Sequence, residues 1–307
     1  MFVSTLEKSN GKRRMSDMRR SEIITGYAFF FPTILGIVFL TYGQMAYSFW
    51  VSLTNWNVFG AKEFIGLKNY IDLLANDFYF WKALRQTLLY AFGSVIAAQL
   101  TALFLALLLN TKRIGGKAIF RTLLYIPSVV PAVASNLLWL WIFNPDYGLL
   151  NAALQLVGLP KGQWIYAEIS AVPSLWIMSA WACGSPMVIY LAGLANVPNE
   201  LLEACEIDGG NAWTKFRHIT IPMISPTLFY NVLMGIISGF MVFNEAYIMT
   251  EGGPNNATMF VNYMIYQEAF QYNKFGYASA LAWIVFALLG LCTLIVFKVF
   301  GKKVYYD

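Results

Sequence analysis

Charged residues are scarce in this chain. Asp, Glu, Lys and Arg together make up 12% of its 307 residues, about half of their usual share in a soluble domain. Histidine occurs once and cysteine three times, so no disulfide framework is expected. Hydrophobic residues, at 58%, are too many for the surface of a soluble protein. Water is therefore not the main solvent of this chain.

Charge is absent altogether from six long stretches, each of at least 23 residues. A helix of about 20 apolar residues crosses the hydrocarbon core of a membrane, so each stretch is long enough for one span. The first stretch exceeds the apolar part of a signal peptide, and we expect it to be retained. The pattern predicts an all-α polytopic membrane protein with six transmembrane helices, at approximately residues 23–53, 86–110, 122–144, 169–195, 222–246 and 276–298.

Lys and Arg predict the orientation of these spans. With the N-terminus inside, fifteen of the 21 basic residues fall on the cytoplasmic side. This bias favours a cytoplasmic N-terminus and C-terminus, and an anionic leaflet of membrane lipids accounts for the net charge of +5 without a nucleic-acid partner. The expected organisation is a basic cytoplasmic segment at 1–22, a six-span domain at 23–300 and a cytoplasmic tail at 301–307.

The spans lack the groups that several kinds of chemistry need. Glu245 is expected at the outer end of the fifth span and His218 at its inner edge, which leaves no charge at mid-depth. An ion-coupled carrier usually keeps such a charge. Gly116 and Lys117 are followed by Ala118, where a nucleotide-binding loop would need Ser or Thr. We therefore expect no catalytic residue, no metal site and no enzyme activity in this chain.

One charged segment interrupts the apolar sequence between the fourth and fifth spans. Apolar residues at helical spacing from Glu200, with Asn199 as N-cap, predict a short helix that Gly209 ends. Asn211 is expected to cap a second short helix, and Pro222 to end it. Helices this short are marginal in isolation, so they need a surface to pack on.

Three interpretations of this segment compete. A plain connector is seldom this long or this periodic in its apolar residues. A DNA-binding helix-turn-helix is disfavoured because the segment is net acidic, which is the wrong sign for phosphates. The third interpretation, which we prefer, is a docking site for a separate cytoplasmic subunit with basic residues on its surface.

The segment also resembles a known motif. Glu203-Ala204-Cys205, Gly209 and Ile219-x-Ile221-Pro222 are spaced like the "EAA" loop of bacterial binding-protein-dependent ABC import permeases, whose usual form is E-A-A-x₃-G-x₉-I-x-L-P. The resemblance implies an ABC type I importer permease fold in the bacterial plasma membrane, with residues 196–222 as the coupling loop. It implies contact with a separate ATPase through Glu203, Ala204, Cys205, Asp208, Gly209, Trp213, Phe216, Ile219 and Pro222.

Three further segments are similar to the carbohydrate-uptake branch of that family: FIGLKNY at 64–70, EGGPNNAT at 251–258 and FGYASALAW at 275–283. The resemblance implies import of a sugar or oligosaccharide by a heterodimer with a second sugar permease, two cytoplasmic ATPase subunits and an extracellular solute-binding protein. ATP and Mg would be bound by the ATPase, and no cofactor by this chain. An ABC importer for another solute, or a secondary carrier or channel acting alone, remains the alternative.

A sugar path needs uncharged polar side chains and aromatic faces. Spans three to six offer seven candidates: Asn136, Trp181, Ser185, Tyr190, Asn231, Ser238 and Asn244. Asn231 and Ser238 are two helical turns apart and are expected on one face. The lack of charge at mid-depth favours a neutral sugar.

Overall fold

The computed structural model describes residues 17–57, 60, 62–111 and 114–300, and the chain divides into two compact units, Met1–Trp50 and Val51–Asp307. Within the described residues the regular structure is helical, and β-pairing is limited to isolated bridges. The predicted all-α class is confirmed. Residues 1–16 of the expected basic segment 1–22, and the expected tail at 301–307, lie outside the described residues.

The described residues of the first unit, 17–50, form a nearly continuous helix. It consists of α1 (Asp17–Gly36), the π-helix η1 (Ile37–Gly43) and the start of α2 (Gln44–Ser52). Pro32 lies inside α1, where it removes one backbone N–H from the helical hydrogen-bond ladder. Residues Glu22–Ser52 are long and apolar enough to cross a membrane, in agreement with the predicted span at 23–53.

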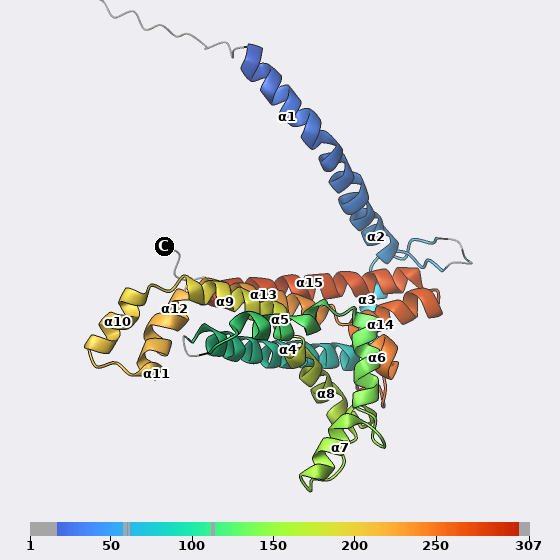
Figure 1. The fold of residues 1–307 in the computed structure, drawn as a ribbon. Helices are drawn as coiled ribbons and strands as arrows, with labels where there is room; N and C mark the ends of the chain where they lie inside the picture. Colours follow the sequence, from blue (N-terminus) through green and yellow to red (C-terminus); the bar gives the residue numbers. More distant parts are fainter. Residues whose placement is uncertain (1–16, 58–59, 61, 112–113, 301–307) are drawn as a thin grey trace, which may run out of the picture. The chain divides into compact units, whose positions relative to one another are not determined.

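The second unit is a bundle of helices around α4 (Figure 1). Before α4 (Phe78–Asn110) come α3 (Lys68–Ile71) and η2 (Asp72–Asn76). The middle of the unit comprises α5 (Lys117–Val129), α6 (Ala132–Ile142), α7 (Leu149–Leu156), η3 (Trp164–Tyr166), α8 (Glu168–Trp181) and α9 (Gly184–Ala195). It continues with α10 (Asn199–Ile207), α11 (Ala212–Lys215), η4 (Phe216–Thr220), α12 (Ile221–Met223) and α13 (Ser225–Phe240). The last elements are η5 (Ala246–Thr250), α14 (Val261–Tyr266), η6 (Gln267–Gln271) and α15 (Phe275–Phe300).

Not every predicted span is one straight helix. In the described part of the chain three single helices could cross a membrane by length and composition, and three bent pairs bring the number to six if each pair is one span. The bends measure 98° between α5 and α6, 48° between α8 and α9, and 69° between residues 212–223 and α13. The predicted span at 122–144 is thus divided between two helices, and this bend was not foreseen. Pro131 follows an extended Val130 at this break and cannot continue the helix of α5.

The helix that contains the second predicted span begins before that span. The charge pattern placed its start at residue 86, whereas α4 begins at Phe78. Asp77 caps this helix, because its Oδ1 accepts hydrogen bonds from the backbone N–H groups of Tyr79 (2.8 Å) and Phe80 (3.1 Å). A helix start is set by its cap, and Lys82 and Arg85 are tolerated in the first turns of a helix that begins outside the apolar core.

Helix α4 is the centre of the second unit because it packs against α8, α9 and α13. The contact with α13 depends on small residues. A Cβ added at Gly239 would lie 2.8 Å from Ala91 Cα, and one at Gly235 would lie 3.2 Å from a Val95 methyl group. Small residues four apart let helix backbones approach closely in membranes. This close approach brings polar side chains of α4 and α13 to one place.

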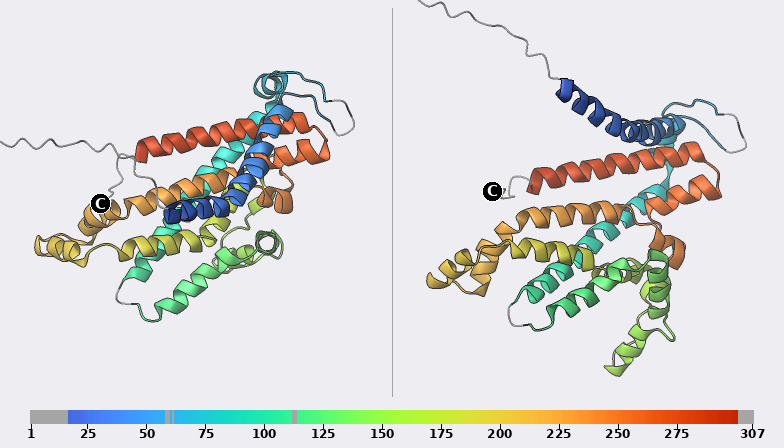
Figure 2. Two further views of the ribbon diagram at one scale, coloured as in Figure 1. Left: turned by 90° about the horizontal axis from the view of Figure 1, so that it is seen from above. Right: turned by 45° about the horizontal axis from the view of Figure 1, so that its top comes forward.

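The two ends of the second unit carry different elements. In both views, α10, α11 and α12 project at the end where α9 and α15 finish, and α3 and α14 lie at the opposite end (Figures 1 and 2). The segment 199–223, which we name the α10–α12 hairpin, is therefore presented at one end of the bundle.

Candidate functional site

A cavity of about 410 Å³ lies between α4, α8, α9 and α13. Helix α4 contributes Tyr90, Ser94 and Gln99 to its wall, and α8 and α9 contribute Ser179 and Ser185. Helix α13 adds Tyr230, Asn231 and Ser238, and Glu245 follows that helix. Hydroxyl and amide groups thus line a hollow inside an otherwise apolar bundle.

Three of the seven predicted substrate-path residues line this cavity: Ser185, Asn231 and Ser238. The expectation that Asn231 and Ser238 share a face of one helix is confirmed, since both lie on α13 and border the same hollow. These three residues remain candidates for contact with a substrate.

The other four predicted residues lie elsewhere. Asn136 is buried on α6, and its Nδ2 has no hydrogen-bond partner among the described residues. The Trp181 ring packs edge-on against Trp139, with ring centroids 5.7 Å apart. Tyr190 is buried behind the wall, and Asn244 is exposed outside the cavity. None of the four belongs to the cavity lining.

A hydrogen-bond network holds the cavity wall in place. The Tyr190 hydroxyl donates to Gln99 Oε1 (2.8 Å), and Gln99 Nε2 donates to the Asn231 carbonyl (3.1 Å). Asn231 Nδ2 in turn donates to the Pro186 carbonyl at 3.3 Å. These bonds join α4, α9 and α13, so Tyr190 supports the wall without lining it.

The sequence interpretation missed the contribution of α4 because it sought polar residues only in spans three to six. A signal was present in the second span, where Tyr90 and Ser94 are one helical turn apart and Gln99 follows. The contribution of Glu245 to the cavity was missed as well. Glu245 was expected at the outer end of the fifth span, and in the structure it follows the end of α13 at Phe240 and lines the cavity.

The α10–α12 hairpin has the two short helices that the sequence predicted. After α10, the Gly210 N–H donates to the Cys205 carbonyl (2.8 Å) and the Gly209 N–H to that of Glu206 (3.0 Å), which is a Schellman helix end. Gly209 has φ +80°, and a Cβ at Gly210 would lie 2.4 Å from Cys205 Sγ. The first glycine is thus needed for its backbone conformation and the second for space.

Two predicted helix boundaries in the hairpin are wrong. Asn199 is the first residue of α10 and not its cap, which is Pro198. Pro222 does not end the second helix, because the helix runs to Met223 and the chain bends at Ile224. The π-helix η4 precedes Pro222 and accommodates a residue that lacks an N–H. The predicted cap at Asn211 is confirmed, since its Oδ1 accepts from the Thr214 N–H at 2.9 Å.

The surface of the hairpin is exposed and partly apolar. Of the nine predicted docking residues, Glu203, Ala204, Asp208, Gly209 and Trp213 are exposed, and Cys205, Phe216, Ile219 and Pro222 are half-buried. Trp213 is 63% exposed although its ring packs on Phe216. Lys215 donates a hydrogen bond to Glu206, and this bond and the charge of Lys215 lower the pKa of the Glu206 carboxyl. An apolar surface of this kind on two short helices is suited to a protein partner.

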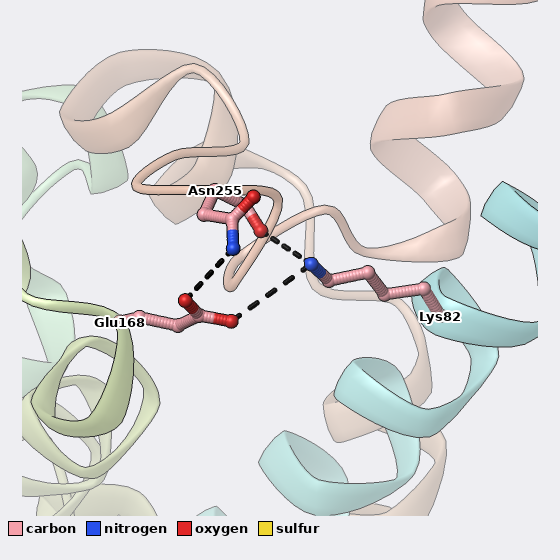
Figure 3. Close-up of polar contacts among 3 residues, drawn as sticks. All are labelled: Lys82, Glu168 and Asn255. Carbon is pink, nitrogen blue, oxygen red and sulfur yellow. Dashed lines mark hydrogen bonds and ion pairs between the residues drawn. The ribbon is translucent and has the colours of Figure 1, made fainter.

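At the opposite end of the bundle, polar contacts fix the 251–258 loop (Figure 3). Lys82 Nζ donates to the Asn255 carbonyl (2.5 Å), and Asn255 Nδ2 donates to Glu168 Oε2 (2.8 Å). Lys82 and Glu168 also form an ion pair at 3.9 Å. This cluster joins the loop to the first turns of α4 and α8.

The segment 275–283 is fixed at the same end. The Tyr277 hydroxyl donates to Asp77 Oδ2 at 2.5 Å, and Asp77 is the residue that caps α4. Two of the three segments that resemble sugar permeases therefore meet the N-terminal end of one helix.

Helices long and apolar enough to cross a membrane, a cavity partly lined by polar groups and an exposed helical hairpin at one end are together typical of a membrane transport subunit. The chain belongs to the family of binding-protein-dependent transport system inner membrane components, whose model matches residues 98–306. It is thus an inner-membrane ABC permease, and the resemblance inferred from the EAA-like loop is confirmed.

Several proteins are similar over most of the chain. The probable ABC transporter permease YesP of Bacillus subtilis is 40% identical over 304 residues, which cover 97% of this chain and 98% of YesP. The arabinooligosaccharides transport permease AraP of the same organism is 32% identical, with 79% and 78% covered. The trehalose/maltose transport permease MalF of Thermococcus litoralis is 30% identical, with 92% and 96% covered.

A solved structure shares the fold. A chain in the crystal structure of a bacterial ABC transporter involved in the import of the acidic polysaccharide alginate superposes with a TM-score of 0.79 at 20% identity, over 93% of this chain and 97% of that one. The predicted type I permease fold is confirmed by this likeness together with the family match.

Proposed function

We propose that this chain is one permease of an ATP-driven sugar or oligosaccharide importer, and that the cavity between α4, α9 and α13 is its part of the sugar path. The observation that carries the proposal is the lining of the cavity by hydroxyl and amide groups and two tyrosines. Sugars are recognised by such groups and by aromatic faces. AraP and MalF, which are named for the transport of arabinooligosaccharides and of trehalose and maltose, support the same substrate class.

The cavity wall is organised before any ligand enters. Gln99 and Asn231 are already hydrogen-bonded to neighbouring helices, so little side-chain freedom is lost on binding. The Ser185 and Ser238 hydroxyl groups can donate or accept, which suits the hydroxyl groups of a sugar.

Two substitutions in the cavity test this path, in cells that carry each variant as the only copy of the permease. Asn231→Ala and Ser238→Val should each lower the initial rate of sugar uptake about tenfold, because each removes a hydrogen bond of about 1.4 kcal/mol or leaves a partner unsatisfied. The matched control is Asn244→Ala, since Asn244 is exposed outside the cavity. Equal uptake in all three variants, at equal amounts of permease in the membrane, would refute the path.

The α10–α12 hairpin is the proposed contact with the ATPase subunit. We assign it to the cytoplasmic face, where its exposed apolar and acidic surface would be covered by an ATPase subunit that binds ATP and Mg. Such a surface is costly to leave in water but favourable at a protein interface. A second sugar permease would complete the pore as a heterodimer, with two ATPase subunits inside and a solute-binding protein outside.

A further inference from the structure

Glu245 is the one ionisable carboxylate in the lining of the cavity. It follows α13 and precedes η5 (Ala246–Thr250). The cavity lining that the structure describes contains no Lys, Arg or His to balance it. The ion pairs found among the described residues join other groups: Lys82 with Glu168, Lys215 with Glu206 and Lys274 with Glu268.

A negatively charged ligand would therefore meet an unfavourable site. On entering the cavity, its carboxylate would lose hydration and find no cationic side chain on the wall that this chain supplies, which is costly in a low-dielectric interior. When Glu245 is ionised, the repulsion between two carboxylates adds to this cost. When Glu245 is protonated, the lining still provides no positive side chain. The partial positive charge at the N-terminus of α9 is weaker than a full carboxylate charge.

The cavity is a favourable site for a neutral sugar or for a sugar that carries an amine. A carboxylate accepts hydrogen bonds from sugar hydroxyl groups, and bonds to an ionised acceptor are stronger than those between neutral groups. Asn231 and Ser238 border the same hollow and offer further donors and acceptors to the same ligand. An ammonium group on the sugar would form an ion pair with Glu245.

We infer that Glu245 makes the cavity a charge filter, which binds neutral and amino sugars and rejects sugars that carry a carboxylate. This inference rests on the proposed sugar path and names the class of its substrate. The likeness to an alginate importer is one of fold at 20% identity, so the charge of the substrate follows from the cavity of this chain.

The filter is tested by ligand binding to the purified membrane complex, in which this chain is assembled with its partner permease and ATPase subunits. The probes are neutral trimers of galactose, glucose and mannose, each paired with the matching uronate trimer. The wild-type complex should bind the neutral member of a pair at least about tenfold more tightly. Glu245→Lys should reverse that preference, because it replaces a negative charge facing the ligand with a positive one. Glu245→Gln should reduce it about fivefold, because it removes the negative charge at nearly constant size.

The matched control is Glu63→Gln, which removes an exposed carboxylate outside the cavity and should leave the preference unchanged. Equal or tighter binding of uronates by the wild-type complex would overturn the filter, as would an unchanged preference in Glu245→Lys. The path and the filter can fail separately. The path is contradicted if Asn231→Ala and Ser238→Val leave sugar uptake unchanged, or if no trimer binds. If those variants lower uptake but the complex shows no charge preference, only the filter is contradicted.

Discussion

Gly239 marks the place where α13 and α4 come closest. The 2.8 Å between a Cβ at this position and Ala91 Cα is too short for any real contact, and the obstacle is backbone that cannot move aside easily. Overpacking of this kind usually costs about 1–3 kcal/mol. The glycine is therefore required by the packing of two helices and not by its own backbone conformation.

Gly239→Ala is expected to destabilise the bundle and to distort the cavity, since Ser238 and Asn231 are on the same helix. The melting temperature of the purified complex should fall by a few degrees, at about 2–4 °C for each kcal/mol, and sugar uptake should fall with it. The matched control is Gly290→Ala on α15, where an added Cβ meets no atom within 4 Å. A melting temperature that is the same for both variants would show that the close approach carries no stability.

Single residues were predictable where a local rule applied. Asn211 as a cap and Gly209 as a helix end follow from local chemistry, and Asn231 with Ser238 follows from helical periodicity. Gln99 and Glu245 were not found, because their positions depend on how α4 packs and on where the chain turns after α13. Packing between distant segments leaves no local signal in a single sequence.

At the scale of elements, the α10–α12 hairpin gives the clearest test. Gly209 has φ +80° with open space around it, so a side chain there would be opposed only by backbone strain. A left-handed conformation costs a typical L-residue about 1–2 kcal/mol, but Asn tolerates it. A comparison of Val with Asn at position 209 therefore separates the effect of backbone conformation from the effect of side-chain size.

Gly209→Val is expected to reorient α10 relative to α11 and to uncouple ATP hydrolysis from uptake, while Gly209→Asn keeps both. Glu203→Lys should also uncouple them by reversing the charge of an exposed docking residue. The measurements are ATPase rate and sugar uptake of the reconstituted transporter, together with the amount of permease in the membrane. Normal coupling in Gly209→Val and Glu203→Lys would contradict the role of the hairpin.

Element types were predicted well and element bounds less well. Apolar length placed α4, α5, α6, α8, α9, α13 and α15 at predicted spans, whereas α7 and α14 lie outside them. The 98° turn between α5 and α6 was not foreseen, and the break predicted at Pro222 falls at Ile224. Both occur near prolines, Pro131 and Pro222. A proline signals that a helix is interrupted, but the angle at the interruption is set by the helices on either side.

At the scale of the whole molecule, the proposed orientation places the hairpin inside the cell and the 251–258 loop outside. Single cysteines in a background without Cys183, Cys205 and Cys292 can report this with a membrane-impermeant thiol reagent. In intact cells Glu63→Cys should be labelled, whereas Gly115→Cys, which lies in the predicted cytoplasmic link between the second and third spans and outside the docking segment, should react only after the membrane is opened. Both sites are exposed, so access to the two faces decides the outcome. Labelling in the opposite pattern would reverse the assigned orientation.

The chain bends between α8 and α9, and hydrogen bonds fix the helix on each side of this bend. Glu168 fastens the far end of α8 to Asn255 and Lys82, and the Pro186 carbonyl fastens the beginning of α9 to Asn231. Between these two anchors, Ala182 and Ser185 border the cavity at a 48° bend. Because residues on both sides of the bend line the cavity, a change in the angle between α8 and α9 would change the width of the cavity.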